Sequence, residues 1–360
     1  MGDPEPSDTA SEMIVLHKHG DVIFELGKGD EPPARLLVSS HVLTMVSPVF
    51  RAMFTGGFAE SQGISSASPR IVSLPDDDRD AMELICRVLH FDTAAIPRKL
   101  NLFAVVDVVV LSDKYNCTAA LRPYGMVWIA ALMDEACDEG FERLLVVAYG
   151  LDLPESFFNL TRELMLERPV RIRKTLWYYE SAMIIPDHEL LLKKLETQRM
   201  ENRKQIIAIF DDVIAPAIKG CQYQPRGCLL HITGIYYVAL GNIGLWPLSD
   251  HIHEMTLQEI RDKVSEMYPI VPIWLPCHPD LCPCGSLVAS GGMEIKKTLS
   301  RALEDLFDQC EGLCLDCWKE GRKLYDEEKC RVEHRNSSSS SSGSLSPQTG
   351  NEYDSDSSNA

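Results

Sequence analysis

Cysteines are the residues of this chain best suited to chemistry, and they are unevenly distributed. Nine of the twelve fall between residues 221 and 330: Cys221, Cys228, Cys277, Cys282, Cys284, Cys310, Cys314, Cys317 and Cys330. Two groups are closely spaced, Cys277-His278 with Cys282-Pro-Cys284, and Cys310-x3-Cys314-x2-Cys317. Thiolate sulfur and imidazole nitrogen hold Zn²⁺ tetrahedrally. The region 277–317 is therefore a candidate structural zinc site, with ordinary thiols or redox chemistry as the alternatives.

Other polar groupings do not complete a catalytic pattern. His251-x-His253-Glu254 lacks the second histidine of a zinc protease, because residue 257, four positions after His253, is leucine. Residues 241–244 (GNIG) have no strand-loop-lysine context for a phosphate cradle, and the chain contains no G-x-S-x-G elbow. It also contains no C-x2-C followed by H-x3-H. We therefore expect no enzymatic activity, and no cofactor apart from the zinc candidate.

The overall composition predicts a soluble globular protein. A chain of 360 residues with 45% hydrophobic and 24% charged residues has room for two domains. Its net charge of -18 disfavours direct binding to nucleic acid or to an anionic membrane. The acidic first residues lack the apolar core of a secretory signal, and no apolar run is long enough to span a membrane. We expect a protein of the cytoplasm or nucleus, whose cysteines are thiols or metal ligands.

The N-terminal third shows a change from strand to helix periodicity. Residues 21–26 and 35–38 alternate as the two strands of a hairpin. From His41 the apolar residues follow a helical period, and Ser47-Pro48 predicts a cap and the start of a second short helix. Residues 76–78, three consecutive aspartates, are expected to cap the next helix.

These residues resemble the BTB/POZ family over roughly residues 12–132. The motifs that carry the resemblance, in order, are Asp21-Val22, His41, Leu43, Ser47-x2-Phe50-x2-Met53-Phe54, Phe58-Ala59-Glu60-Ser61, Ile71–Leu74 and Leu111-Ser112-Asp113-Lys114-Tyr115. The resemblance implies a small sheet capped by helices, with residues 103–111 helical despite their many valines, and a further helix over 121–132. The short Ser-Pro-Val-Phe form and the tail are similar to BTB proteins of filamentous fungi.

The resemblance implies a non-catalytic protein-interaction module. Members of the family often self-associate as homodimers through the first helix and strand, and some dock on a cullin scaffold as substrate adaptors of a ubiquitin ligase. A BTB-containing transcriptional regulator without its own DNA-binding motif is the alternative. The candidate interaction residues are Asp21, His41, Val42, Met45, Phe50 and Phe54.

Asp21 resembles the buried strand aspartate of the family, but the residue after His41 differs from that of the animal members. There a basic residue follows the histidine and pairs with the aspartate in a groove for co-repressor peptides, whereas here the residue is Val42. Because an unpaired buried carboxylate is costly, we expect Asp21 to be either more exposed or paired otherwise, with Arg35 as a candidate. We expect His41 to be a structural hydrogen-bonding group at the helix start.

The chain as a whole is expected to be an α+β protein. The part that follows the BTB/POZ domain is expected to be mostly helical. We expect a disordered leader (1–11), the BTB/POZ domain (12–132), a helical region (133–262), a Cys-rich region (263–334) and a disordered Ser-rich acidic tail (335–360). Candidate helices in the helical region are 141–149, 155–167, 174–185 and 187–210. In the tail, residues 353–357 are a candidate phosphorylation site, with an inert solubilising tail as the alternative.

Overall fold

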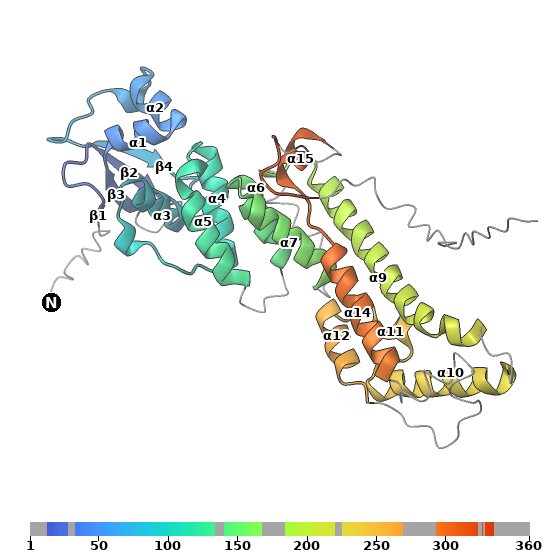
Figure 1. The fold of residues 1–360 in the computed structure, drawn as a ribbon. Helices are drawn as coiled ribbons and strands as arrows, with labels where there is room; N and C mark the ends of the chain where they lie inside the picture. The colour runs from blue at the N-terminus through green and yellow to red at the C-terminus, as the bar shows by residue number, and fades with distance from the viewer. Residues whose placement is uncertain are drawn as a thin grey trace, which may run out of the picture.

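The structure is a computed structural model that describes most of the chain. The described residues are 13–27, 33–133, 140–167, 184–219, 225–268, 293–322, 326 and 328–334. As expected, the protein is α+β, with one small mixed sheet near the N-terminus and helices through the rest of the chain (Figure 1). The leader and the acidic tail of the sequence analysis lie outside the described residues.

The sheet has four strands in the order β1-β3-β2-β4. Strands β2 (Val22–Leu26) and β3 (Ala34–Val38) pair antiparallel, which confirms the predicted hairpin. Strand β4 (Arg70–Leu74) runs parallel to β2, and β1 (Met13–Val15) runs parallel to β3. Every second residue of β2 is buried, as strand geometry requires when only one face meets the core.

Two short helices follow the hairpin directly, α1 (Ser40–Val46) and α2 (Pro48–Thr55). Ser47 separates them and caps α2, because its hydroxyl accepts a hydrogen bond from the Phe50 N–H. Pro48 occupies the first turn of α2, where its missing N–H costs nothing. The predicted break at the Ser-Pro pair is therefore confirmed.

Three helices complete the N-terminal part: α3 (Arg79–Leu89), α4 (Leu102–Lys114) and α5 (Thr118–Met133). Asp78 caps α3 by accepting a hydrogen bond from the Ala81 N–H, as predicted for the aspartate run. The valine-rich segment is helical because it packs against three helices, α3, α5 and α6 (Leu144–Gly150), so that burial overrides strand propensity.

The C-terminal helices pack in a chain that leads away from the sheet (Figure 1). After α6 come α7 (Pro154–Leu166), α9 (His188–Lys219), α10 (Pro225–Asn242), α11 (Leu248–His251), α12 (Leu257–Ser265), α14 (Met293–Gln309) and α15 (Leu315–Glu320). Helix α7 contacts α6, α9 and α15, while α14 lies against α9 and α12. The predicted helices over 141–149, 155–167 and 187–210 are present, and most of the candidate over 174–185 lies outside the described residues.

The boundary expected between a helical region and a Cys-rich region at residue 262 does not separate the packed elements. Helix α14 lies in the range expected to be Cys-rich, yet it packs on α9 and α12. One continuous hydrophobic core runs from Val22 in β2 to Leu315 in α15. Within the described part of the chain, no helix has both the length and the apolar character needed to cross a membrane.

Candidate metal centre

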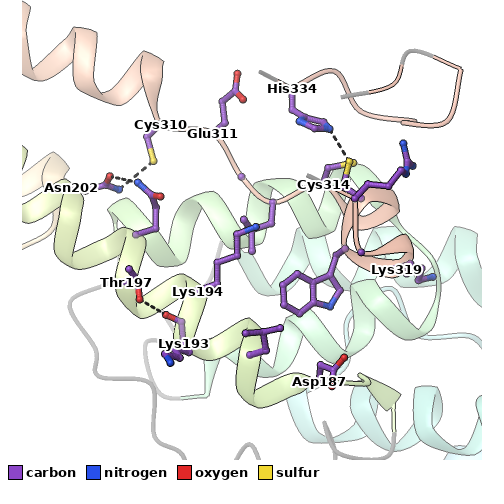
Figure 2. A pocket seen from close by; sticks show the side chains of 18 of the residues that line it. Asp187, Lys193, Lys194, Thr197, Asn202, Cys310, Glu311, Cys314, Lys319 and His334 are labelled. Carbon is purple, nitrogen blue, oxygen red and sulfur yellow. Dashed lines mark hydrogen bonds between the residues drawn. The ribbon is translucent and has the colours of Figure 1, made fainter. Parts of the chain in front are cut away.

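Four side chains of metal-binding type converge near the end of the described chain. They are Cys314, Cys317, Cys330 and His334, whose ligand atoms all lie within 4.8 Å of one another. Cys317 Sγ lies 3.5 Å from Cys330 Sγ and 3.3 Å from His334 Nε2, and Figure 2 shows the histidine ring directed at the sulfur atoms. Sulfurs bound tetrahedrally at ~2.3 Å from Zn²⁺ lie roughly 3.8 Å apart. The cluster can therefore hold a metal ion after only small side-chain adjustments.

The local backbone brings the four ligands together. Cys314 is the N-cap of α15, and Cys317 lies in the first turn of that helix. Gly321 ends α15 in the left-handed conformation (φ 63°), and the Arg322 N–H then returns to the Cys317 carbonyl at 2.8 Å. A second turn follows, in which the Cys330 N–H donates to the Asp326 carbonyl at 2.8 Å. These turns direct Cys330 and His334 back to α15.

The segment before Cys314 is held tightly against α7. The Leu313 N–H donates to Thr161 Oγ1 at 2.8 Å. Gly312 lies so close to α7 that an added Cβ would be 1.9 Å from the Phe158 carbonyl oxygen, so only glycine fits there. Arg162 on α7 donates to the Cys310 and Phe307 carbonyls at 2.8 Å each. The first two ligands are therefore fixed to the helical core before any metal is bound.

A carboxylate hub fixes the other side of the cluster. Asp152, in the turn between α6 and α7, accepts hydrogen bonds from Arg331, Lys319 and Arg122 at 2.7–2.8 Å. Hydrogen bonds from Arg331, and then from Lys319, hold the pKa of Asp152 well below its usual range. Arg331 also donates to Asp316 in α15. Because Arg331 follows Cys330 directly, this network orients the third ligand.

The thiols of the cluster differ in acidity. Burial raises the pKa of Cys314, and it raises the pKa of Cys317 to about 12. Burial acts in the same sense on Cys330, but hydrogen bonds with the Asp326 backbone and with His334 outweigh it and lower the pKa to about 7. Since metals bind thiolates, metal binding at neutral pH displaces protons, mainly from Cys314 and Cys317.

The sequence predicts this site only in part. The grouping of Cys310 with Cys314 and Cys317 is wrong, because the Cys310 sulfur faces α9 and accepts a hydrogen bond from Asn202 Nδ2 at 3.3 Å. The other candidate group, residues 277–284, lies outside the described residues. Cys330 and His334 were missed as ligands. The spacing C-x2-C-x12-C-x3-H carries the signal, and it differs from the C-x2-C…H-x3-H finger pattern in having cysteine as the third ligand.

Asp21 is paired, in agreement with one of its two expected states, whereas His41 does not take the role expected of it. Asp21 accepts hydrogen bonds from the Ser40 N–H and the Ser40 hydroxyl, both at 2.7 Å, at the start of α1. It does not pair with Arg35, whose guanidinium instead binds Glu25 at 2.7 Å across the hairpin. His41 is exposed, and among the described residues its ring forms no hydrogen bond, so the structural role expected of it belongs to Asp21.

The remaining candidate interaction residues divide into surface and core. Phe50 and Phe54 are 0% and 6% exposed, and they stack with Phe24 of β2. Their assignment as contact residues is wrong, because their rings fill the core. Met45 is exposed and Val42 half-buried, so both remain accessible to a partner.

Comparison with known proteins does not assign this chain to a family. No model of a known protein family matches it, and no curated protein does. Its function must therefore be inferred from its own residues and their arrangement.

Proposed function

We propose that this chain is a non-catalytic protein-interaction protein with a BTB-like N-terminal part and a zinc-bound C-terminal segment. The observation that carries the interaction role is the apolar edge strand β1. Two further features support the BTB-like fold: a hairpin followed by two short helices, and a next strand that is parallel to the first strand of the hairpin and leads into three helices. This is the element order that the sequence resemblance implies.

Strand β1 has the features of a pairing edge. It lies at one end of the sheet order, and its Met13 and Val15 side chains are 43% and 52% exposed. An edge strand with unpaired backbone groups and apolar side chains is a template for another strand. Met45 adds a further exposed apolar side chain on α1. The first partner proposed is a second copy of the chain, and the family resemblance adds a cullin scaffold as a second partner.

Charge placed on β1 tests this proposal. The full-length variant Met13→Lys/Val15→Lys should shift from dimer to monomer in light scattering, because like charges on an edge strand prevent strand pairing. The matched control is Ile71→Lys on β4, the opposite edge of the sheet, where Ile71 is 50% exposed. A wild-type chain that is monomeric at high micromolar concentration would contradict self-association. Binding of purified cullin to wild type but not to the β1 variant would place both partners on the same surface.

The cluster of Cys314, Cys317, Cys330 and His334 is proposed to bind one structural Zn²⁺ ion. Three sulfurs and one imidazole form a complete tetrahedral set, which leaves no position open for substrate or water. Bound there, the ion would join α15 to Cys330 and His334, in addition to the ion pairs that Arg331 forms with Asp152 and Asp316.

Metal analysis of purified protein tests the zinc site directly. Wild type should contain one more Zn²⁺ per chain than Cys330→Ser or His334→Ala. Cys310→Ser is the matched control, because this buried thiol lies nearby in sequence but outside the cluster. Equal zinc content in wild type and both ligand variants would exclude the site.

A further inference from the structure

A groove of about 1010 Å³ lies between α9 and the chain that runs from the end of α14 through α15. Lys193 and Lys194 line one side from α9, and Trp318, Lys319 and Arg322 line the other. Figure 2 shows the two α9 lysines and the α15 segment on facing sides of this space. The groove is therefore lined by several cations and one large aromatic ring.

The charge of the groove contrasts with that of the whole chain, which carries a net charge of -18. Lys193 and Lys194 are exposed, and neither forms an ion pair with any residue that the structure describes. The Lys194 ammonium lies 5.9 Å from the centre of the Trp318 ring. Asp187 and Glu311 are the acidic lining residues, and Lys319 is already bound to Asp152. The two α9 lysines thus offer positive charge that no described side chain neutralises.

The chain itself supplies an acidic segment beside this groove. His334 lines the groove and is the last described residue before the C-terminal tail. Residues 336–360 contain Glu352, Asp354 and Asp356 but no lysine or arginine. The intervening residues span up to roughly 3.3 Å each, so the acidic stretch can reach any part of a groove that begins at His334.

We infer that this groove binds the acidic stretch Glu352–Ser358 of the chain's own C-terminal tail. Its carboxylates complement Lys193 and Lys194, and Tyr353 within the stretch matches the exposed Leu190 and the Trp318 ring. Tethering makes a weak contact sufficient, because attachment to the same chain raises the effective concentration of a binding segment, to the millimolar range for short linkers. Elsewhere the negative net charge of the protein repels the tail. This docking is independent of β1 pairing and of the identity of the metal.

Competition with a peptide in trans tests the inference on full-length protein. The probe is a fluorescent peptide with the sequence of residues 349–360, followed by anisotropy. The tail-neutral variant Glu352→Gln/Asp354→Asn/Asp356→Asn should bind it several-fold more tightly than wild type, because its own tail no longer competes. Adding Lys193→Glu/Lys194→Glu to that variant should abolish binding. Adding Lys204→Glu should not, since Lys204 is an exposed lysine of α9 outside the groove.

Two results would overturn the inference. Equal peptide affinity in wild type and the tail-neutral variant would mean that the tail does not occupy the groove. An equal loss of peptide binding with Lys204→Glu would mean that the peptide responds to positive charge anywhere on α9 and not to the groove. Binding should also weaken at high salt, because the screening length falls from about 10 Å at 0.1 M to about 3 Å at 1 M. Zinc content measured on the same samples distinguishes loss of the groove from loss of the metal.

Zero-length carbodiimide cross-linking of the wild-type chain identifies the lysines that the acidic stretch of the tail contacts. Amide bonds between tail carboxylates and Lys193 or Lys194 should form in several-fold higher yield than bonds to Lys204. Similar yields at all three lysines would show that the tail has no preferred site. Cross-links found only between differently isotope-labelled copies would show that the groove binds the tail of a second copy. That result would overturn the inference.

Discussion

Arg331 and Asp152, 179 residues apart in the chain, form a two-point ion pair. Arg331 Nη1 and Nη2 donate to the two Asp152 oxygens at 2.7 and 2.8 Å. Parallel donation of this kind fixes orientation as well as distance. Asp152 also accepts a hydrogen bond from Arg122 in α5, so a single carboxylate joins the segment that carries Cys330 and His334 to the N-terminal part of the protein.

Removing the charge of Asp152 should destabilise the protein in a pH-dependent way. The pKa of Asp152 is lower in the folded than in the unfolded chain, so its ionised form adds stability above the usual carboxyl pKa of about 3.9. That contribution is lost as pH falls through the folded-state pKa. Asp152→Asn should therefore melt below wild type near neutral pH, and the difference should shrink in acid. Asp308→Asn, an exposed position on α14, serves as the control and should show no difference at either pH.

His90 should make the N-terminal part sensitive to mild acid. Its Nε2 accepts a hydrogen bond from the Ser39 N–H at 3.0 Å while Nδ1 contacts the Cys86 carbonyl at 2.8 Å, an arrangement that requires the neutral ring. Burial, aided by the neighbouring His17, lowers its pKa below 6.5. The stability it contributes is present above about pH 6.5 and lost as pH falls through the lower folded value. The melting temperature of wild type should fall over this pH range, whereas that of His90→Gln should depend less on pH. His41→Gln, at an exposed ring, should leave the pH profile of wild type unchanged.

Gly312→Ala should displace the segment that carries the first ligands. The new Cβ would lie 1.9 Å from the Phe158 carbonyl oxygen, a backbone atom that cannot rotate away. Overpacking of this kind costs roughly 1–3 kcal/mol, and we expect a lower melting temperature together with weaker zinc retention. Gly241→Ala in α10 has no atom within 4 Å of the new Cβ and should be neutral or slightly stabilising. Similar melting temperatures for the two variants would refute the close approach to α7.

A chelator should destabilise wild type but not the ligand variants. If Zn²⁺ binds only the folded chain, a free Zn²⁺ concentration 1,000 times the dissociation constant adds about 4 kcal/mol to the free energy of unfolding. Removing the metal removes that contribution. The melting temperature of wild type should fall on adding chelator, and that of Cys330→Ser should be low already and unaffected. A chelator-insensitive wild type would mean that the four side chains pack without a metal.

Tyr115→Phe should destabilise the protein, because it removes a hydrogen-bond donor from the buried carboxylate of Asp77. The Asp77 side chain is 2% exposed, and it accepts hydrogen bonds from the Tyr115 hydroxyl and from Lys114. Loss of one donor to a buried acceptor costs about 1–3 kcal/mol. Denaturant unfolding of Tyr115→Phe should show this loss, whereas Tyr268→Phe, at a ring that is 84% exposed, should match wild type.

The sequence determined those elements that depend on neighbours along the chain. The hairpin, the break at Ser47-Pro48 and the Asp78 cap each follow from side-chain periodicity or from a bond spanning three residues. The helical state of residues 102–114 did not follow from neighbours along the chain. Periodicity left it open, and burial against three helices decided it over the strand propensity of its valines.

Only the tertiary structure decided which polar groups meet. Sequence spacing placed Cys310, Cys314 and Cys317 together, but the close contact of Gly312 with α7 turns Cys310 toward Asn202. The turns at Gly321 and Asp326 bring Cys330 and His334 next to Cys314 and Cys317. Asp21 likewise binds Ser40 and not Arg35, since the partner of a polar group is set by the nearest donor in space. Local rules fix the backbone pattern, whereas long-range packing selects the ligands.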